Sequence, residues 1–582
     1  MTIMTRKRFQ VLIVLFLVFA ARIFAYEKTR LIPGVTVEGQ EVKITVTTFY
    51  PSSDMRLYLN FEDEARRDYH PFPPYMYTLT DKKEFMNNHE FVVPIAPQTP
   101  RYVRSIPPGV VVHFRLSCVM YVDKKAVPVR SKDYSFRIIK DKNNAFKAGL
   151  CFTRTPVVAN VYDDKATITW ESNYPSQTRF IYYHKRQNMP AVIETKESHR
   201  RVEIALEGLR PETKYDYQIE VFSTETNDSY LSPVMNFWSA PKGNNFAFAV
   251  MGDSRANSMS IEPDANINGV NVHELNALSY LAYLSGARFI LFPGDLINGY
   301  TEDVNDVHLQ YDTWCDAIAP IRSRIPYYAG MGNHDTSAPW RSFTPTEDNK
   351  DLPYPETIWA DVFVLPENGP GACKDMPPYT ENVYSFNYGN CHFVMLNSDY
   401  NFLKDAPRDA IYVRYLDEMQ RQWLEIDLKS NLDKDFLFVA FHQPAYPTSA
   451  HYGKSLDRFP AERDALWTIL DKYNVDAVFV GHEHIYTRLL VDSAINPAWN
   501  NEVWQITTGR AGAPWYPINK EAPWIQNVKR YNYNPHFVRI EVKGSKIGCK
   551  VYDIDGAVID EFVLHKKKRP RKQLLEETQA GK

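Results

Sequence analysis

Five short polar clusters carry the residue types that bind metal ions in proteins, and each follows directly after an apolar run. In chain order they lie at 252–255 (GDSR), 294–298 (GDLIN), 332–335 (GNHD), 442–444 (HQP) and 481–484 (GHEH). Carboxylate, carboxamide and imidazole ligands without cysteine suit Zn, Mn or Fe rather than a soft-metal site. Since a closed tetrahedral site uses four ligands, this larger set predicts two ions that share a bridging carboxylate.

Each cluster taken alone has a simpler interpretation. A single buried histidine is more often a hydrogen-bonded core residue than a ligand, and a single Gly-Asp pair is usually just a turn. All five clusters occur together, each at the end of an apolar run. That coincidence favours the metal site over five unrelated turns.

The elements that must position these clusters can be identified from hydrophobic patterns. Buried strands are predicted for the short apolar runs at 246–251, 289–292, 327–329, 436–441 and 477–480. Helical periodicity appears between several of these runs, at 272–286, 416–428 and 461–473. Such alternation predicts an α/β core, in which ligands collect at the carboxyl ends of the strands. We therefore expect the clusters to converge within a catalytic domain over 241–564, which ends in β alternation at 537–564.

Two β modules are predicted ahead of this domain. Residues 26–150 alternate short apolar runs with Pro-rich turns and read as a β domain of uncertain type, a packing or spacer module. Residues 151–240 have the strand spacing of an antiparallel sandwich. The strand that holds Trp170, followed by the segment 208–215 (GLRPETKY), resembles a fibronectin type III domain. These modules offer surfaces for contacts with other molecules.

The two ends of the chain differ from the rest. A basic patch at 6–8 and an apolar core at 11–21 predict a cleaved signal peptide over 1–25, and hence a secreted or periplasmic protein, with an uncleaved anchor as the alternative. The basic run that begins at 565 predicts a disordered tail over 565–582, with attachment to an anionic surface as the alternative. The six cysteines allow fifteen full disulfide pairings, and some of them can equally be buried thiols.

Composition excludes several classes of protein. The chain has 67 Lys and Arg against 70 Asp and Glu, a net charge of −3, which argues against a nucleic-acid partner. Only one long apolar run exists, and it is too short for a stable membrane span. With 44% hydrophobic and 24% charged residues in 582, the chain is an ordinary multidomain globular protein.

The five clusters in this order resemble those of the calcineurin-like metallophosphoesterases, and the sandwich placed before them resembles the layout of purple acid phosphatases. The resemblance implies a double β-sheet sandwich flanked by helices, with a dinuclear centre. It implies these ligands: for one ion Asp253, Asp295 and His484; for the other Asp295, Asn333, His442 and His482. It also implies that His334 contacts the phosphoryl group and assists the leaving group, and that Asp335 orients His334.

Two positions depart from the pattern of these families. Arg255 stands where many relatives have a histidine, and Asn298 stands where purple acid phosphatases place a tyrosine ligand. A guanidinium has no lone pair for a metal, so Arg255 cannot be a ligand. Its planar fork suits contact with a substrate phosphate, and a structural ion pair is the alternative. The identity of the metals therefore stays open among Fe, Zn and Mn.

The sequence as a whole predicts an exported, metal-dependent hydrolase of phosphate monoesters or diesters that acts through a metal-activated water. The alternative is a surface-binding or adhesion protein with a degenerate phosphatase-like domain, for which Arg255 is the best argument. Two further features are left with two interpretations each. The Pro-rich insertion at 338–382 is either a rim that selects the substrate or a packing excursion. His451 is either a substrate contact or a surface histidine.

Overall fold

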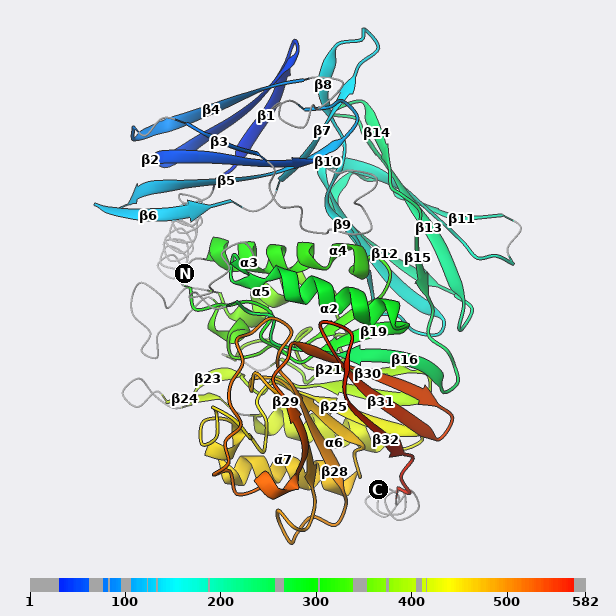
Figure 1. Ribbon diagram of the computed structural model, residues 1–582. Coiled ribbons are helices and arrows are strands. Elements are labelled where there is room, and N and C mark those ends of the chain that lie inside the picture. Colours follow the sequence, from blue (N-terminus) through cyan, green and yellow to red (C-terminus); the bar gives the residue numbers. More distant parts are fainter. Residues whose placement is uncertain are drawn as a thin grey trace, which may run out of the picture.

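The computed structural model describes residues 31–61, 77–81, 84–95, 106–122, 124–131, 134–186, 189–256, 266–301, 304–338, 353–372, 376–404, 411–414 and 416–569. The N-terminal part of this chain is built of strands, and the C-terminal part is an α/β domain with two sheets (Figure 1). The predicted fold class is confirmed. The predicted signal peptide lies outside the described residues.

The first module is an eight-stranded antiparallel sheet. Its strands are β1 Pro33–Glu38, β2 Glu41–Phe61, β3 Tyr77–Thr80, β4 Met86–Pro94, β5 Val111–Val122, β6 Lys125–Arg130, β7 Tyr134–Lys140 and β8 Phe146–Gly149. The long strand β2 pairs with β4 over its first part and with β3 and β5 over its second, so one strand ties the sheet together. The apolar core of this first module is separate from the core of the C-terminal domain.

The second module has seven strands, of which the longest, β10, is the central one. They are β9 Phe152–Ala159, β10 Lys165–Tyr183, β11 Ala191–Glu194, β12 His199–Glu207, β13 Lys214–Ser223, β14 Asp228–Leu231 and β15 Met235–Trp238. Trp170 is 1% exposed and stacks on Phe180, with 6.2 Å between ring centroids. The hydroxyl of Tyr215 accepts a hydrogen bond from the backbone of Arg210 at 2.8 Å, which closes the predicted turn. The fibronectin type III assignment and the domain boundaries stay predictions.

The first sheet of the α/β domain has the order β20-β19-β16-β30-β31-β32. Its strands are β16 Asn245–Val250, β19 Ala287–Phe292, β20 Tyr327–Ala329, β30 His536–Lys543, β31 Lys546–Asp553 and β32 Val558–His565. The helices on its outer side are α2 Val272–Leu284, α3 Val304–Ala317, α4 Ala319–Arg322 and α5 Pro355–Val362. Strands β16, β19 and β20 are parallel, so their carboxyl ends meet at one edge.

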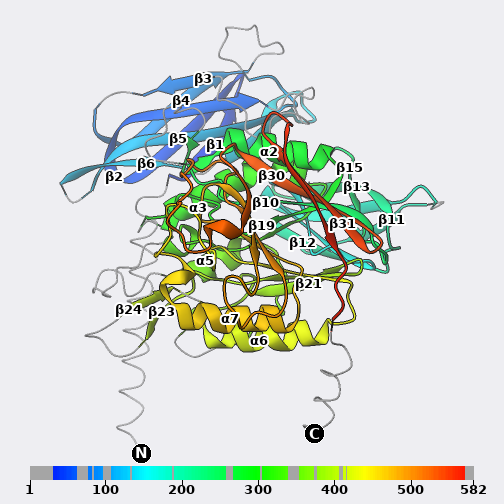
Figure 2. The ribbon, with the colours of Figure 1, turned by 60° about the horizontal axis from the view of Figure 1, so that its bottom comes forward.

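The second sheet has the order β21-β22-β25-β26-β28-β27-β29. Its strands are β21 Tyr384–Tyr388, β22 Cys391–Met395, β25 Phe436–Ala440, β26 Ala477–Val480, β27 Tyr486–Val491, β28 Val503–Thr508 and β29 Val528–Asn532. Helices α6 Glu418–Ser430 and α7 Pro460–Lys472 lie on its outer side, opposite to α2 and α3 (Figures 1 and 2). Between the sheets, Phe248 packs against Phe289 and Phe393 with centroids 4.9 and 5.1 Å apart. This aromatic interior holds the two sheets in fixed relation.

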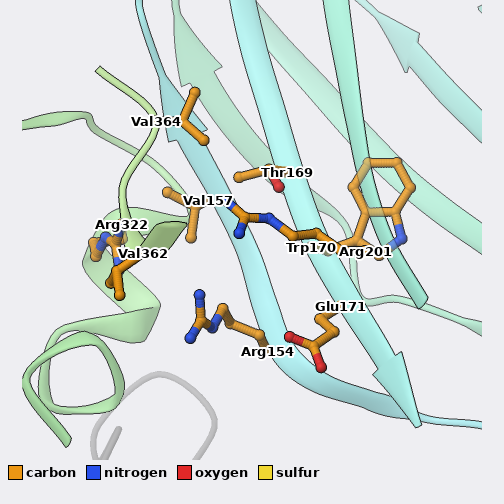
Figure 3. Close-up of a pocket in the computed structure, with 9 residues that line it drawn as sticks. All are labelled: Arg154, Val157, Thr169, Trp170, Glu171, Arg201, Arg322, Val362 and Val364. Carbon is orange, nitrogen blue, oxygen red and sulfur yellow. The ribbon is translucent and has the colours of Figure 1, made fainter. Parts of the chain in front are cut away.

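The seven-stranded module packs directly on the α/β domain. The hydroxyl of Tyr217 donates to the carbonyl of Ser323 at 2.7 Å, and the guanidinium of Arg288 lies 3.8 Å from the ring centroid of Trp238. A crevice at this boundary has nine lining residues (Figure 3), Arg154, Val157, Thr169, Trp170, Glu171, Arg201, Arg322, Val362 and Val364. None of these nine belongs to the five polar clusters. The crevice is therefore a feature of the domain boundary, separate from the predicted site.

The described part of the insertion at 338–382 packs into the core. It contains α5, where Trp359 is fully buried against Tyr311, with 5.9 Å between ring centroids. Trp340 and Arg341 lie outside the described residues. Five of the six cysteines, namely 118, 151, 315, 391 and 549, are buried, and Cys373 lies outside the described part. No helix among the described residues has the length and apolar character that crossing a membrane requires.

The basic run at the C-terminal end makes specific contacts in its described part. His565 ends β32, and Arg569 forms an ion pair with the fully buried Asp476. The same guanidinium donates to the carbonyls of Lys434 at 2.9 Å and Asp435 at 2.7 Å. Composition suggested a solvated segment from 565 onward, but buried carboxylate and carbonyl acceptors fix residues 565–569. Residues 570–582 lie outside the described part.

We expect Arg569→Met to lower the apparent free energy of unfolding of the α/β domain by about 3–5 kcal/mol, because it leaves a buried carboxylate without its cation. The Arg569 side chain is 2% exposed and that of Asp476 is 0% exposed, so water cannot replace the guanidinium. Urea unfolding followed by tryptophan fluorescence measures the effect. Lys568→Met, at an exposed neighbour, is the control and should change stability by no more than about 0.5 kcal/mol. Equal midpoints for the two variants would contradict the expectation.

Candidate metal centre

The five predicted clusters meet at the carboxyl ends of strands from both sheets. Two groups of side chains there have ligand atoms that all lie within 4.8 Å of one another. The members of the first group are Asp253, Asp295 and His484, and those of the second are Asp295, His442 and His482. All of them are buried. Asp295 belongs to both groups, which is the arrangement that a bridging carboxylate requires.

Left-handed backbone conformations place the key ligands. Asp253, Asp295 and His482 have φ values of 60°, 56° and 67°, which non-glycine residues seldom adopt. Such strain persists where surrounding contacts determine it, and it concentrates at functional sites. Here the backbone N–H of His482 donates to Asp253 Oδ1 at 2.9 Å, and that of His334 donates to Asp295 Oδ1 at 2.9 Å. The strands and these hydrogen bonds together fix both carboxylates.

Crowding requires a glycine at two of the positions that precede site residues, Gly332 and Gly481. A Cβ on Gly481 would lie 2.2 Å from Asp253 Oδ2, and one on Gly332 would lie 2.3 Å from Asp295 Oδ1. In the structure the aspartates adopt the unusual φ, and the glycines at 332 and 481 make room for carboxylate oxygens.

Three histidines of the site are oriented in the same way. The Nδ1 atoms of His442, His484 and His334 lie 2.9, 2.6 and 2.5 Å from the carbonyls of Pro293, Pro514 and Asn298. A carbonyl can only accept, so Nδ1 carries the proton and donates in each case. The lone pair is therefore on Nε2, which faces the cluster. This is the outer-shell arrangement that holds imidazole ligands in metalloproteins.

The second group concentrates acceptor atoms around one point. His442 Nε2 lies 3.2 Å from both Asp295 Oδ1 and Asn333 Oδ1. Asn333 Nδ2 donates to the hydroxyl of Tyr300 at 3.2 Å, so its Oδ1 faces the histidine. Burial lowers the pKa of His442, but the charges of Asp295 and Asp253 outweigh it and raise this pKa to about 10. The site therefore demands a positive charge here, which a proton or a metal ion can supply.

The buried carboxylates of the site also require positive charge nearby. Asp253 Oδ2 and Asp295 Oδ2 are buried, and neither has a hydrogen-bond partner among the described residues. Burial raises the pKa of Asp253 well above its ordinary value, whereas the charges of His442 and His334 hold that of Asp295 well below it despite burial. Buried carboxylate oxygens without hydrogen-bond partners, beside imidazole rings, are the donor set that fits Zn, Mn or Fe. All six predicted ligands, Asp253, Asp295, Asn333, His442, His482 and His484, are thus brought together.

His334 lies beside this ligand set. Its Nε2 is 3.9 Å from Asp295 Oδ2, and the ring of Tyr300 stands edge-on to it at 4.6 Å. Burial lowers the pKa of His334 to about 4, so the ring is neutral at pH 7 with its proton on Nδ1. Nε2 is free to face a group bound between the ligands and Tyr300. Tyr300, 47% exposed, is a site residue that the search for ligand types missed, although it follows Asn298 by two positions.

Asp335 has a different role from the one implied by resemblance. The carbonyl of Asn298, and not Asp335, holds the ring of His334. The carboxylate of Asp335 accepts from the backbone N–H of Gly332 at 2.9 Å and of Leu296 at 3.3 Å, which ties two clusters together. Burial raises the pKa of Asp335 to about 7. Asp335 therefore positions the loop, and the ring of His334 depends on a backbone group of the second cluster.

His451 lies at the site and is not an isolated surface histidine. Its ring stacks on that of His482, with centroids 3.9 Å apart and planes at 28°. The buried Glu483 accepts from the backbone N–H of His451 at 2.7 Å and so holds its loop beside the ligands. Tyr516 stacks on His484 at 4.2 Å and was not anticipated, because the loop after β28 contains none of the five clusters.

Comparison with known proteins agrees with this geometry. The calcineurin-like phosphoesterase family model matches residues 272–486. Purple acid phosphatase 23 of Arabidopsis thaliana is 24% identical over 301 residues, which are 49% of this chain and 57% of that protein. Probable inactive purple acid phosphatase 9 of the same plant is 27% identical over 226 residues, 36% of this chain and 32% of that protein. The chain thus spans about a third to somewhat over half of the length of these curated relatives.

A solved structure extends the likeness to nearly the whole chain. Purple acid phosphatase PPD1 from yellow lupin (Lupinus luteus) seeds superposes with a TM-score of 0.56 at 17% identity, and the match covers 93% of this chain and 95% of that one. At this identity the superposition establishes the fold. The superposed part includes the two sheets, the flanking helices and the β modules ahead of them. The chain therefore matches the calcineurin-like phosphoesterase family model over residues 272–486, and it is similar to purple acid phosphatases in sequence and in fold.

Proposed function

We propose that this protein is an exported, metal-dependent hydrolase of phosphate esters. The observation that carries the proposal is the pair of buried ligand groups that share Asp295, with His334 directly beside them. When bound at such a centre, metal ions supply Lewis-acid stabilisation of phosphoryl transfer. Zn, Mn and Fe all fit the donors, and two ions would use all six ligands.

The chain's own residues then perform the remaining tasks. Asp253, Asp295 and the histidines hold the ions, and Tyr300 fixes the amide of Asn333 so that its oxygen faces them. His334 Nε2 stands where it can hydrogen-bond a phosphoryl oxygen or the leaving group. Once a phosphoryl anion lies against the ring, its charge favours protonation at Nε2, and the proton can pass to the departing oxygen.

Two parts of the proposal rest on sequence. The basic patch at 6–8 and the apolar run at 11–21 support secretion or export to the periplasm. The β modules support contacts with surfaces or other proteins. The alternative function, a binding protein with a degenerate phosphatase domain, is favoured by one observation, that the side chain of Arg255 contacts His484.

Hydrolysis of p-nitrophenyl phosphate and bis(p-nitrophenyl) phosphate by the full-length protein tests the proposal. We expect turnover of at least one ester, loss of that turnover with a chelator, and its return when Zn, Mn or Fe is added. The ester that is preferred distinguishes a monoesterase from a diesterase. Histidines outside the site should not matter for this activity. His199→Asn, at an exposed histidine of β12, should therefore leave the activity and its response to metals unchanged. No turnover with any of these metals would overturn the proposal and favour the binding protein.

A further inference from the structure

Arg255 contacts the first ligand group directly. Its Nη2 lies 3.3 Å from His484 Nε2 and donates to the hydroxyl of Tyr516 at 3.2 Å. Its Nε lies 3.4 Å from Asp295 Oδ2. The side chain is only 12% exposed, and the backbone N–H of Arg255 donates to the carbonyl of Asp295 at 3.3 Å. The guanidinium is thus anchored among the atoms that would hold the first ion.

The contact with His484 uses the lone pair that a metal needs. The Nδ1–H of His484 is directed to the carbonyl of Pro514 at 2.6 Å, so Nε2 carries the only available lone pair of the ring. One lone pair either accepts from Arg255 or coordinates an ion, so the two compete.

Charge adds to the competition. A guanidinium stays protonated at any working pH and repels a metal cation at this distance. It also supplies part of the positive charge that Asp253 and Asp295 demand. The second group differs, because Arg255 makes no hydrogen bond or ion pair with Asn333, His442 or His482 among the described contacts.

We propose that the guanidinium of Arg255 takes the place of a metal cation in the first ligand group. The chain would then bind one ion firmly at the second group and a further ion only weakly at the first. Arg255 must leave His484 before the first group can bind its ion. The proposal uses the ligand set of the proposed function but does not depend on hydrolysis.

Ion binding by the metal-free, full-length protein tests this inference without substrate. Titration with Zn²⁺ by calorimetry, supported by equilibrium dialysis, should give one tight and one weak ion per chain. In Arg255→Met the dissociation constant of the weaker ion should fall by about 10- to 100-fold, the value of a lost hydrogen bond that involves a charged group. Arg255→Gln, which keeps a polar side chain but removes the charge, should shift the dissociation constant of the weaker ion in the same direction.

Two further variants locate the effect. Arg255→Met combined with Asp253→Asn should lose the gained affinity, because Asp253 belongs to the first group alone. Arg539→Met removes a partly buried arginine of β30 that contacts Ser285 and Glu541, and it should leave both affinities unchanged. Unaltered binding of the tight ion in Arg255→Met shows that the second group is intact.

Several outcomes would overturn the inference. Two ions of equal affinity in the unaltered protein, an unchanged weaker ion in both Arg255 variants, or a gain that survives Asp253→Asn would each do so. Failure of the proposed function has a different signature. The ion-binding pattern would then hold as expected while no phosphate ester is turned over.

Discussion

Asp295→Asn should abolish firm metal binding and reduce ester hydrolysis by about 10³-fold or more, since bound ions contribute several kcal/mol to phosphoryl transfer. Asp295 is 1% exposed and belongs to both ligand groups, and its Oδ2 has no hydrogen-bond partner in the part of the chain that the structure describes. The asparagine has the same shape but lacks the charge, so the amide can still accept from the backbone of His334. Loss of metal would therefore come from the missing charge and not from a collapsed loop.

Metal content by elemental analysis and kcat with p-nitrophenyl phosphate, measured on the same preparation, check this expectation. Asp433→Asn makes the same chemical change on a carboxylate that is 67% exposed, and it should retain full metal content and activity. Circular dichroism should be unchanged in both variants. An Asp295→Asn protein with full metal content and near-normal turnover would contradict a centre built around a shared carboxylate.

His334→Ala should retain metal and lose rate, by about 10²–10⁴-fold for esters with poor leaving groups. His334 donates Nδ1–H to the carbonyl of Asn298 and directs Nε2 toward the ligand set without being one of the grouped ligands. A p-nitrophenolate leaving group needs little protonation, whereas an alkoxide needs it most. The loss should therefore be smaller for p-nitrophenyl phosphate than for an alkyl phosphate.

This difference can be measured with a series of esters whose leaving groups differ in pKa, at fixed metal content. We expect kcat to depend more steeply on the leaving-group pKa in the variant than in the unaltered protein. His199→Ala, at an exposed histidine of the seven-stranded module, serves as the control. Equal losses for all esters would assign His334 to phosphoryl binding alone. Loss of metal together with rate would instead make His334 part of the ion site.

The order of strands and ligand clusters could be predicted from the sequence because both depend on local patterns. A buried parallel strand is a short apolar run, and the chain must turn where the run ends, so 246–251 and 289–292 directly predict where Asp253 and Asp295 lie. This rule predicted that the clusters converge, whereas the choice of six ligands within them came from the resemblance to calcineurin-like metallophosphoesterases. Each ligand group takes residues from both sheets, so its proximity also depends on how the two sheets pack.

The contacts that modify the site were decided by tertiary structure. Arg255 and His484 are 229 positions apart, and their 3.3 Å contact depends on how two loops from different sheets approach each other. Tyr516 comes from a loop that contains none of the five clusters, and the group that holds His334 is the backbone carbonyl of Asn298, which no pattern of side chains reveals. Arg569 is a further case, because a basic run has the composition of a solvated tail until the fold presents a buried carboxylate. Residue type and spacing determined which atoms could bind metal in this protein, whereas loop conformation, which no local pattern encodes, decided which cation competes for them.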